Sequence, residues 1–137
     1  MAIQLNLDGV YIPSFNKQIK INYYSKRKNF FVVGSAHNLK EIKIKEKQGV
    51  HAIFLTPLFK TIKTNKFLGS IKFNLLSKIT KKKIIALGGI NKLNIQKLFL
   101  LNVYGFASIS FLNNTDKVSI DKIITKQKNH IGNIMKK

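Results

Sequence analysis

Residues 50–89, "VHAIFLTPLFKTIKTNKFLGSIKFNLLSKITKKKIIALGG", carry the pattern that decides the fold. The stretch starts with the apolar run 50–55 and finishes with the run 83–89. Both runs are short, rich in branched or aromatic residues, and closed by threonine–proline or glycine, which is typical of strands. Between them, apolar residues recur at helical spacing: Ile71, Leu75, Leu76 and Ile79. A strand, a helix and another strand in this order predict a βαβ unit with parallel strands.

The same alternation continues on both sides of this stretch. Further short apolar runs lie at 9–12, 30–34 and 104–110, and helical spacing recurs between 38 and 49 and between 91 and 102. Residues in N-cap positions precede three of the helices: Asn38, Ser70 and Asn91. The chain is therefore predicted to be α/β, with about five parallel strands covered by helices. A last helix is expected over 113–137.

The length of 137 residues predicts a single domain over 1–137. No apolar run approaches the roughly 18 residues of a membrane span, and the start "MAIQLNLDG" does not resemble a secretory signal. The absence of cysteine excludes disulfides and thiolate zinc sites. We therefore expect a cytoplasmic protein without a membrane partner.

The charge is strongly positive, because 25 Lys and Arg face 5 Asp and Glu, for a net +20. This predicts non-specific attraction to nucleic acid at low salt. Only Arg27 is arginine, the side chain best suited to reading phosphates and guanine edges. Lysine, isoleucine, asparagine and phenylalanine are abundant together, as an A+T-rich coding sequence would produce. A basic nucleic-acid-binding protein is therefore the least favoured hypothesis.

The predicted strands end in residues suited to holding an anion. Functional residues in parallel α/β sheets gather at the carboxyl ends of strands. These ends read "GSAHN" (34–38), "TPLFKTIKTNK" (56–66), "GGIN" (88–91) and "SIS" (108–110). Each could be an ordinary turn or a solvated loop. Together, the backbone amides of Gly88 and Gly89, the hydroxyl of Ser110 and the loop lysines predict a phosphate cradle.

These motifs, in this order, resemble the thiamine phosphate synthase and TenI family. Its members carry G-x-S-x-H, a strand leading into P-x-F-x-T, an I-G-G-I strand end and a V-x-x-S strand end. The segment "LDGVYIP" (7–13) is similar to the family's A-D-G-V-H-L. The resemblance covers about residues 5–112. It implies a (β/α)8 TIM barrel, of which this chain would supply the second half to two-thirds.

The resemblance also implies roles for individual residues. The phosphate of a thiazole phosphate would be held by backbone amides around Gly88, Gly89, Ile109 and Ser110. Thr61 would match the first threonine of the family loop, while Lys63, Thr64 and Lys66 compete for its second threonine and its lysine. Ser35 would lie near the reacting centre, and His37 would carry protons, as histidine does near neutral pH.

Several parts of the family pattern are missing from this sequence. Synthase members use Mg²⁺, but the Q-L-R-x-K and I-N-D segments are absent, and Asn16 stands closest to the place of a magnesium aspartate. No metal ligand is therefore assigned. Five strands in place of eight would also leave one sheet face partly uncovered at Phe31, Val33, Phe54, Ile85 and Leu87. A truncated or split gene product, a homo-oligomer or a complementary half-barrel would explain this pattern.

The expected function is that of a thiamine phosphate synthase/TenI-like protein of thiamine biosynthesis that binds a thiazole phosphate. Family resemblance favours an enzyme, either a transferase or a thiazole tautomerase-like isomerase. Synthase activity is not expected from this chain alone, because the residues that would hold the pyrophosphate and the metal are missing. The alternatives are a tautomerase-like subunit and a non-catalytic phosphate-ligand binder.

Overall fold

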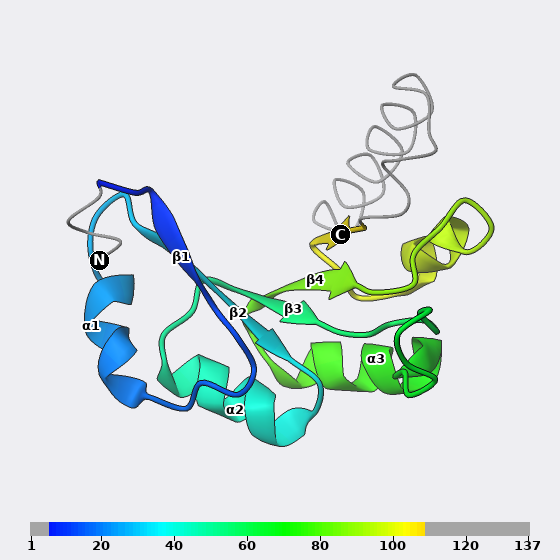
Figure 1. The fold of residues 1–137 in the computed structure, drawn as a ribbon, viewed down its shortest axis with the longest axis horizontal. Coiled ribbons are helices and arrows are strands. Elements are labelled where there is room, and N and C mark those ends of the chain that lie inside the picture. Colours follow the sequence, from blue (N-terminus) through cyan, green and yellow to red (C-terminus); the bar gives the residue numbers. More distant parts are fainter. Residues whose placement is uncertain (1–5, 109–137) are drawn as a thin grey trace, which may run out of the picture.

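The computed structural model describes residues 6–108, and its centre is a single five-stranded sheet (Figure 1). All neighbouring strands pair in parallel, in the order β1-β2-β3-β4-β5. The strands are β1 (Gly9–Ile12), β2 (Phe31–Ala36), β3 (Ala52–Leu55), β4 (Lys83–Leu87) and β5 (Gly105–Ala107). The predicted α/β class and parallel sheet are confirmed.

Helices connect successive strands. The connections contain the 3-10 helix η1 (Ile19–Ile21), α1 (Asn22–Ser25), α2 (Leu39–Lys47), α3 (Gly69–Ile79) and the 3-10 helix η2 (Ile95–Leu100). Figure 1 shows α2 and α3 on the same side of the sheet. Within residues 6–108, no helix is long and apolar enough to cross a membrane.

The apolar core lies between the sheet and these helices. Val32, Ile53 and Ile84 point from three neighbouring strands toward Ile42 of α2 and Phe73 of α3, and all five are buried. The alternate residues of the strands lie on the other face, where no described helix packs. Phe31 is 48 % exposed there. Val33, Phe54, Ile85 and Leu87 are partly exposed, so the predicted incomplete cover of this face is confirmed.

The start of α2 follows directly from its sequence. The Asn38 side chain accepts a hydrogen bond from the Glu41 backbone N–H at 3.0 Å, as an N-cap does. The helix ends before Gly49, whose φ of +71° suits the left-handed turn that stops a helix. The predicted cap at Asn38 is therefore confirmed.

Two other predicted helix starts are wrong. In α3 the N-cap position is Leu68, with no side-chain cap, and Ser70 lies inside the helix. The helix expected from Asn91 is instead η2, which begins at Ile95 after a turn. The apolar pattern of α3 was also misleading, because its buried residues are Phe73, Leu76 and Ser77, whereas several residues that set its spacing are exposed: Ile71, Leu75 and Ile79.

Candidate functional site at the carboxyl edge of the sheet

The loop after β3 packs against the end of β4. Backbone N–H groups of Leu58 and Phe59 donate to the carbonyls of Leu87 and Gly88, at 2.9 and 3.0 Å. The basic loop and the glycine pair predicted to form one site are therefore neighbours. They meet at the carboxyl edge of the sheet, where parallel α/β proteins place their ligands.

Gly88 and Gly89 permit this close approach. Their φ angles are +97° and +69°, in the region that favours glycine. A Cβ on Gly88 would lie 2.7 Å from the Pro57 Cβ, and one on Gly89 would lie 2.4 Å from the Lys60 carbonyl oxygen. The glycine pair is thus required by its contact with the loop, beyond making a tight turn.

The loop is closed at its base and ordered within. The N–H groups of Leu68 and Gly69 donate to the carbonyls of Pro57 and Leu58, both at 2.9 Å. Inside the loop, the Thr61 hydroxyl accepts from the Thr64 N–H at 3.2 Å. The Thr64 hydroxyl likewise accepts from the Lys66 N–H at 3.0 Å. Both threonines therefore shape the loop, and each hydroxyl keeps its own proton to donate.

The lysines of the loop extend into solvent. Lys60, Lys63 and Lys66 are exposed, while Thr61 and Thr64 are partly buried. Lys97 of η2 adds a further cation, 5.9 Å from the centre of the Phe59 ring. Positive charge thus surrounds the loop, and any of these lysines could turn toward an anion.

His37 follows β2 on the same edge and is held by Glu41. One Glu41 carboxylate oxygen accepts from the His37 backbone N–H at 2.7 Å and lies 2.8 Å from its Nδ1. A carboxylate can only accept, so Nδ1 carries a proton and, in the neutral ring, Nε2 is the basic nitrogen. The Glu41 carboxylate therefore selects the Nδ1–H tautomer of the neutral ring.

The Glu41 carboxylate is itself kept ionised. Burial raises its pKa, but hydrogen bonds from the His37 N–H, the His37 ring and Asn38, together with the charge of His37, outweigh burial and lower the pKa below its ordinary value. Glu41 was missed by sequence reasoning. The spacing of Asn38 and Glu41 is that of a capping box and could have revealed it.

Ser35 lies on the helix-free face of β2 and is only 4 % exposed. Its Oγ accepts a hydrogen bond from the Tyr11 hydroxyl at 2.8 Å. The Tyr11 ring lies 6.2 Å from that of Phe54. Tyr11 was not predicted as a site residue. Its alternation with Ile12 on β1 places it on this face and was the available signal.

The structure therefore brings most of the predicted residues to one edge. Ser35 and His37 lie at the end of β2, the loop residues after β3, and Gly88 and Gly89 after β4. Ser108, after β5, donates to the Ile90 carbonyl at 2.8 Å and so lies beside the glycine pair. Ile109 and Ser110, predicted phosphate ligands, and the expected helix 113–137 lie outside the described residues.

The described residues do not fit a magnesium site at this edge. Within residues 6–108 no group of three His, Cys, Asp or Glu side chains could hold a metal ion. The Asn16 side-chain oxygen accepts from the Gln18 N–H at 3.0 Å, and Asp8 precedes β1 at the opposite edge.

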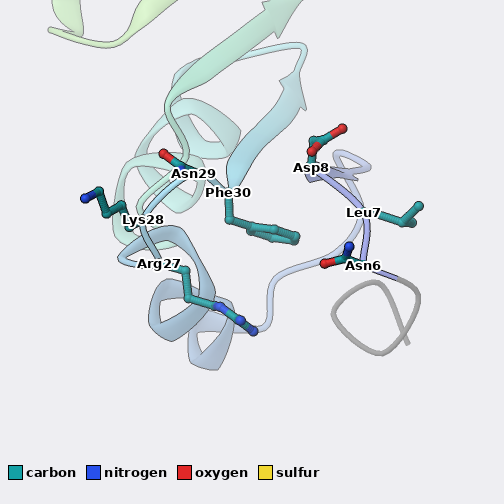
Figure 2. Close-up of a pocket in the computed structure, with 7 residues that line it drawn as sticks. All are labelled: Asn6, Leu7, Asp8, Arg27, Lys28, Asn29 and Phe30. Atoms are coloured by element: carbon teal, nitrogen blue, oxygen red, sulfur yellow. The ribbon is translucent and has the colours of Figure 1, made fainter.

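A hollow of about 210 Å³ lies at the other edge of the sheet (Figure 2). It is lined by residues that precede β1 or β2: Asn6, Leu7, Asp8, Arg27, Lys28, Asn29 and Phe30. Parallel strands all begin at one edge, so this hollow is separated from the candidate site by the length of the strands.

The sequence comparisons with known proteins agree on one family. The model of the family described as thiamine monophosphate synthase matches residues 1–112. A protein of Aquifex aeolicus called "Putative thiamine-phosphate synthase 2" is 33% identical over 117 residues, which cover 80% of this chain. A thiamine-phosphate synthase of Lysinibacillus sphaericus is 28% identical over 135 residues, or 96% of this chain.

Solved structures give the same fold. A thiamine phosphate pyrophosphorylase from Pyrococcus furiosus superimposes with a TM-score of 0.74 at 24% identity, covering 92% of this chain. The parallel sheet with its helices therefore corresponds to part of a TIM-barrel-like fold. The chain spans 60% and 63% of the two sequence relatives and 63% of the solved chain.

Proposed function

Because the chain belongs to the thiamine monophosphate synthase family, we propose that it takes part in thiamine biosynthesis and binds a thiazole phosphate at the carboxyl edge of its sheet. The observation that supports this most is the packing of the basic loop on Gly88 and Gly89. That packing supports the proposal because it brings the basic loop, with its threonines and lysines, against the glycine pair at the strand ends.

The proposed reaction at this site is proton transfer by His37. The Glu41 carboxylate holds Nδ1, and Nε2 of the neutral ring is left to take a proton from the bound heterocycle and return it. The phosphate would serve as the anchor that keeps the ring near Nε2. This is the tautomerase-like alternative. Joining a pyrimidine pyrophosphate would require a pyrophosphate clamp and carboxylates that the described residues do not supply.

Calorimetric titration with thiazole phosphate at moderate salt tests the binding. The parent chain should bind, and Gly89→Asp should weaken binding by about tenfold or more, because its Cβ would displace the loop and its carboxylate would repel the phosphate. Gln96→Asp, an exposed change on η2 that adds the same charge, is the matched control and should bind like the parent. Absence of binding by the parent would refute the proposal.

The role of His37 is tested separately. His37→Ala should abolish turnover of a thiazole phosphate carboxylate and leave phosphate affinity within about twofold of the parent. Equal loss of affinity and turnover would show that His37 binds the ligand and does not carry protons. Binding without turnover in the parent would support the non-catalytic binder.

A further inference from the structure

Lys45 of α2 is a fully buried lysine that the site described above does not use. It is 0 % exposed. Its ammonium donates three hydrogen bonds, to the carbonyls of Pro13 and Asn16 at 2.7 and 3.0 Å and to Oε1 of Gln48 at 3.0 Å. An ammonium has three donors, so all of them are occupied. Burial lowers the pKa of Lys45, and the Glu41 carboxylate partly opposes this.

Gln48 holds the same segment from one turn further along. Its Nε2 donates to the carbonyls of Asn16 and Gln18 at 3.0 and 3.1 Å. Two side chains at the end of α2 therefore bind three carbonyls of residues 13–18. This segment has few bonds of its own, among them one from the Asn16 N–H to the Pro13 carbonyl at 3.1 Å.

Segment 13–18 begins at the carboxyl edge of the sheet, where the candidate site lies. It leaves β1 directly after Ile12, which pairs with Gly34, so Pro13 begins level with Ser35. The residue before Ile12 is Tyr11, whose hydroxyl binds the Ser35 Oγ. In the described part of the chain β1 pairs only with β2, so the anchoring of its end depends on the segment that follows.

Gly34 makes room for the lysine. A Cβ on Gly34 would lie 2.6 Å from the Lys45 Cδ and 3.2 Å from its Cγ. The lysine stem therefore crosses β2 at the one position of that strand without a side chain. Gly34, Lys45 and Gln48 act as a unit, because the lysine reaches Pro13 only over the glycine.

We propose that Lys45 and Gln48 are positioning residues for the candidate site: they fix segment 13–18 where it leaves the carboxyl edge and thereby keep Tyr11 against Ser35. A buried ammonium bound only to neutral acceptors is less stabilising than an apolar side chain of its size. Its directional bonds to the segment explain its presence. The identity of the ligand in this inference rests on the proposed function.

Lys45→Met tests the inference, because methionine keeps most of the stem and removes all three donors. Lys40→Met, an exposed change on the same helix, is the control for loss of charge. Amides of residues 14–18 should exchange about tenfold faster in Lys45→Met than in the control, while those of α3 should not change. Affinity for thiazole phosphate should fall by about fivefold or more.

A general loss of stability is controlled by Thr80→Val. This change removes the hydrogen bond between Thr80 and Glu46 and touches no atom of segment 13–18. Thr80→Val should lower the unfolding midpoint and leave affinity as in the parent. If Lys45→Met does not fold, Gln48→Leu retains the lysine, and faster exchange confined to residues 16–18 with weaker affinity is expected.

The outcomes separate the two proposals. Unchanged exchange at 14–18 in Lys45→Met, or faster exchange with unchanged affinity, would overturn the positioning role. If the parent does not bind thiazole phosphate, the proposed function fails, and the exchange pattern alone decides whether Lys45 holds the segment. Gly34→Ala gives an independent check, because it should reproduce the faster exchange while Lys45 is present and have little further effect in Lys45→Ala.

Discussion

Two glycines with nearly equal positive φ angles have different surroundings in this protein. Gly89 and Gly69 have φ angles of +69° and +71°. A Cβ on Gly89 would meet two carbonyl oxygens of the loop, at 2.4 and 2.6 Å, whereas the nearest atom to one on Gly69 is a ring carbon of Phe67 at 3.9 Å. Adding a side chain at each glycine therefore measures two losses of unfolding free energy separately: the loss due to the positive φ, and the loss due to the contact with the loop.

Gly69→Ala should destabilise the chain by about 1 kcal/mol, the cost of a positive φ for alanine. Gly89→Ala should cost about 3 kcal/mol, because the loop backbone must also move. Urea unfolding of both variants measures the difference. Equal losses would mean that the loop yields freely and does not pack on Gly89 in solution.

Residue-level chemistry was only partly predictable from the sequence. His37 and Ser35 could be named as candidates because they stand at a strand end in a recognisable motif. Their partners Glu41 and Tyr11 come from the next helix and from a neighbouring strand, and a pairing of that kind depends on register. Lys45 could not be found, because a lysine on a helix is ordinarily exposed.

At the scale of elements, η2 shows how local hydrogen bonds replace an expected α-helix. The Asn91 side chain accepts from the N–H groups of Leu93 and Asn94, and the Asn94 side chain accepts from the Asn91 N–H. The side-chain amide of Asn94 also donates to the Gly89 carbonyl at 2.8 Å. Asparagine side chains thus satisfy the backbone as turns do, and the helix begins later than its apolar spacing suggests.

The α2 helix should give the protein a defined acid sensitivity. Burial raises the pKa of Glu46, but hydrogen bonds from Thr80 and Lys43 and the charges of Lys43 and Lys82 lower it overall. The pKa of Glu41 is also lowered overall. Both carboxyls hold protons less tightly in the folded state than in the unfolded chain. Their stabilisation is therefore complete above the ordinary value of 4.5 and is lost as pH falls through the lowered values.

Unfolding midpoints measured in urea between pH 7 and pH 3 should show this loss begin near pH 4.5. The double variant Glu41→Gln, Glu46→Gln should be less stable than the parent at neutral pH and converge with it in acid. Parallel curves for the two proteins would show that neither carboxylate is stabilised by folding.

At the scale of the whole molecule, one face of the sheet is covered and the other is not. Phe73, on the covered side, is 0 % exposed, and Phe31, on the other, is 48 % exposed. His51 gives Phe31 partial cover, with its ring stacked at 5.0 Å. Five strands were predictable from the apolar runs. Their incomplete cover was predictable because eight strands are needed to close a barrel.

Truncation of each phenylalanine measures that cover in solution. Phe73→Ala should lower the free energy of unfolding by about 3–5 kcal/mol, as for a buried aromatic residue, and Phe31→Ala should lower it by about 1 kcal/mol. Unfolding of the 137-residue chain at several protein concentrations is the measurement. A cost at Phe31 similar to that at Phe73, rising with concentration, would show that a second copy covers this face.

Two backbone hydrogen bonds close the loop after β3, one from Leu68 to Pro57 and one from Gly69 to Leu58. They make the loop a structural unit that can vary independently of the strand and helix that it connects. Residues 61–66, which lie between the closing bonds and beyond the contacts with Gly88 and Gly89, can change in length or in the order of their threonines and lysines without moving β3 or α3. Doubling such a loop costs only about 0.6 kcal/mol. The unusual order of Thr61, Lys63, Thr64 and Lys66 is therefore a change that ligand choice could select at little expense to folding.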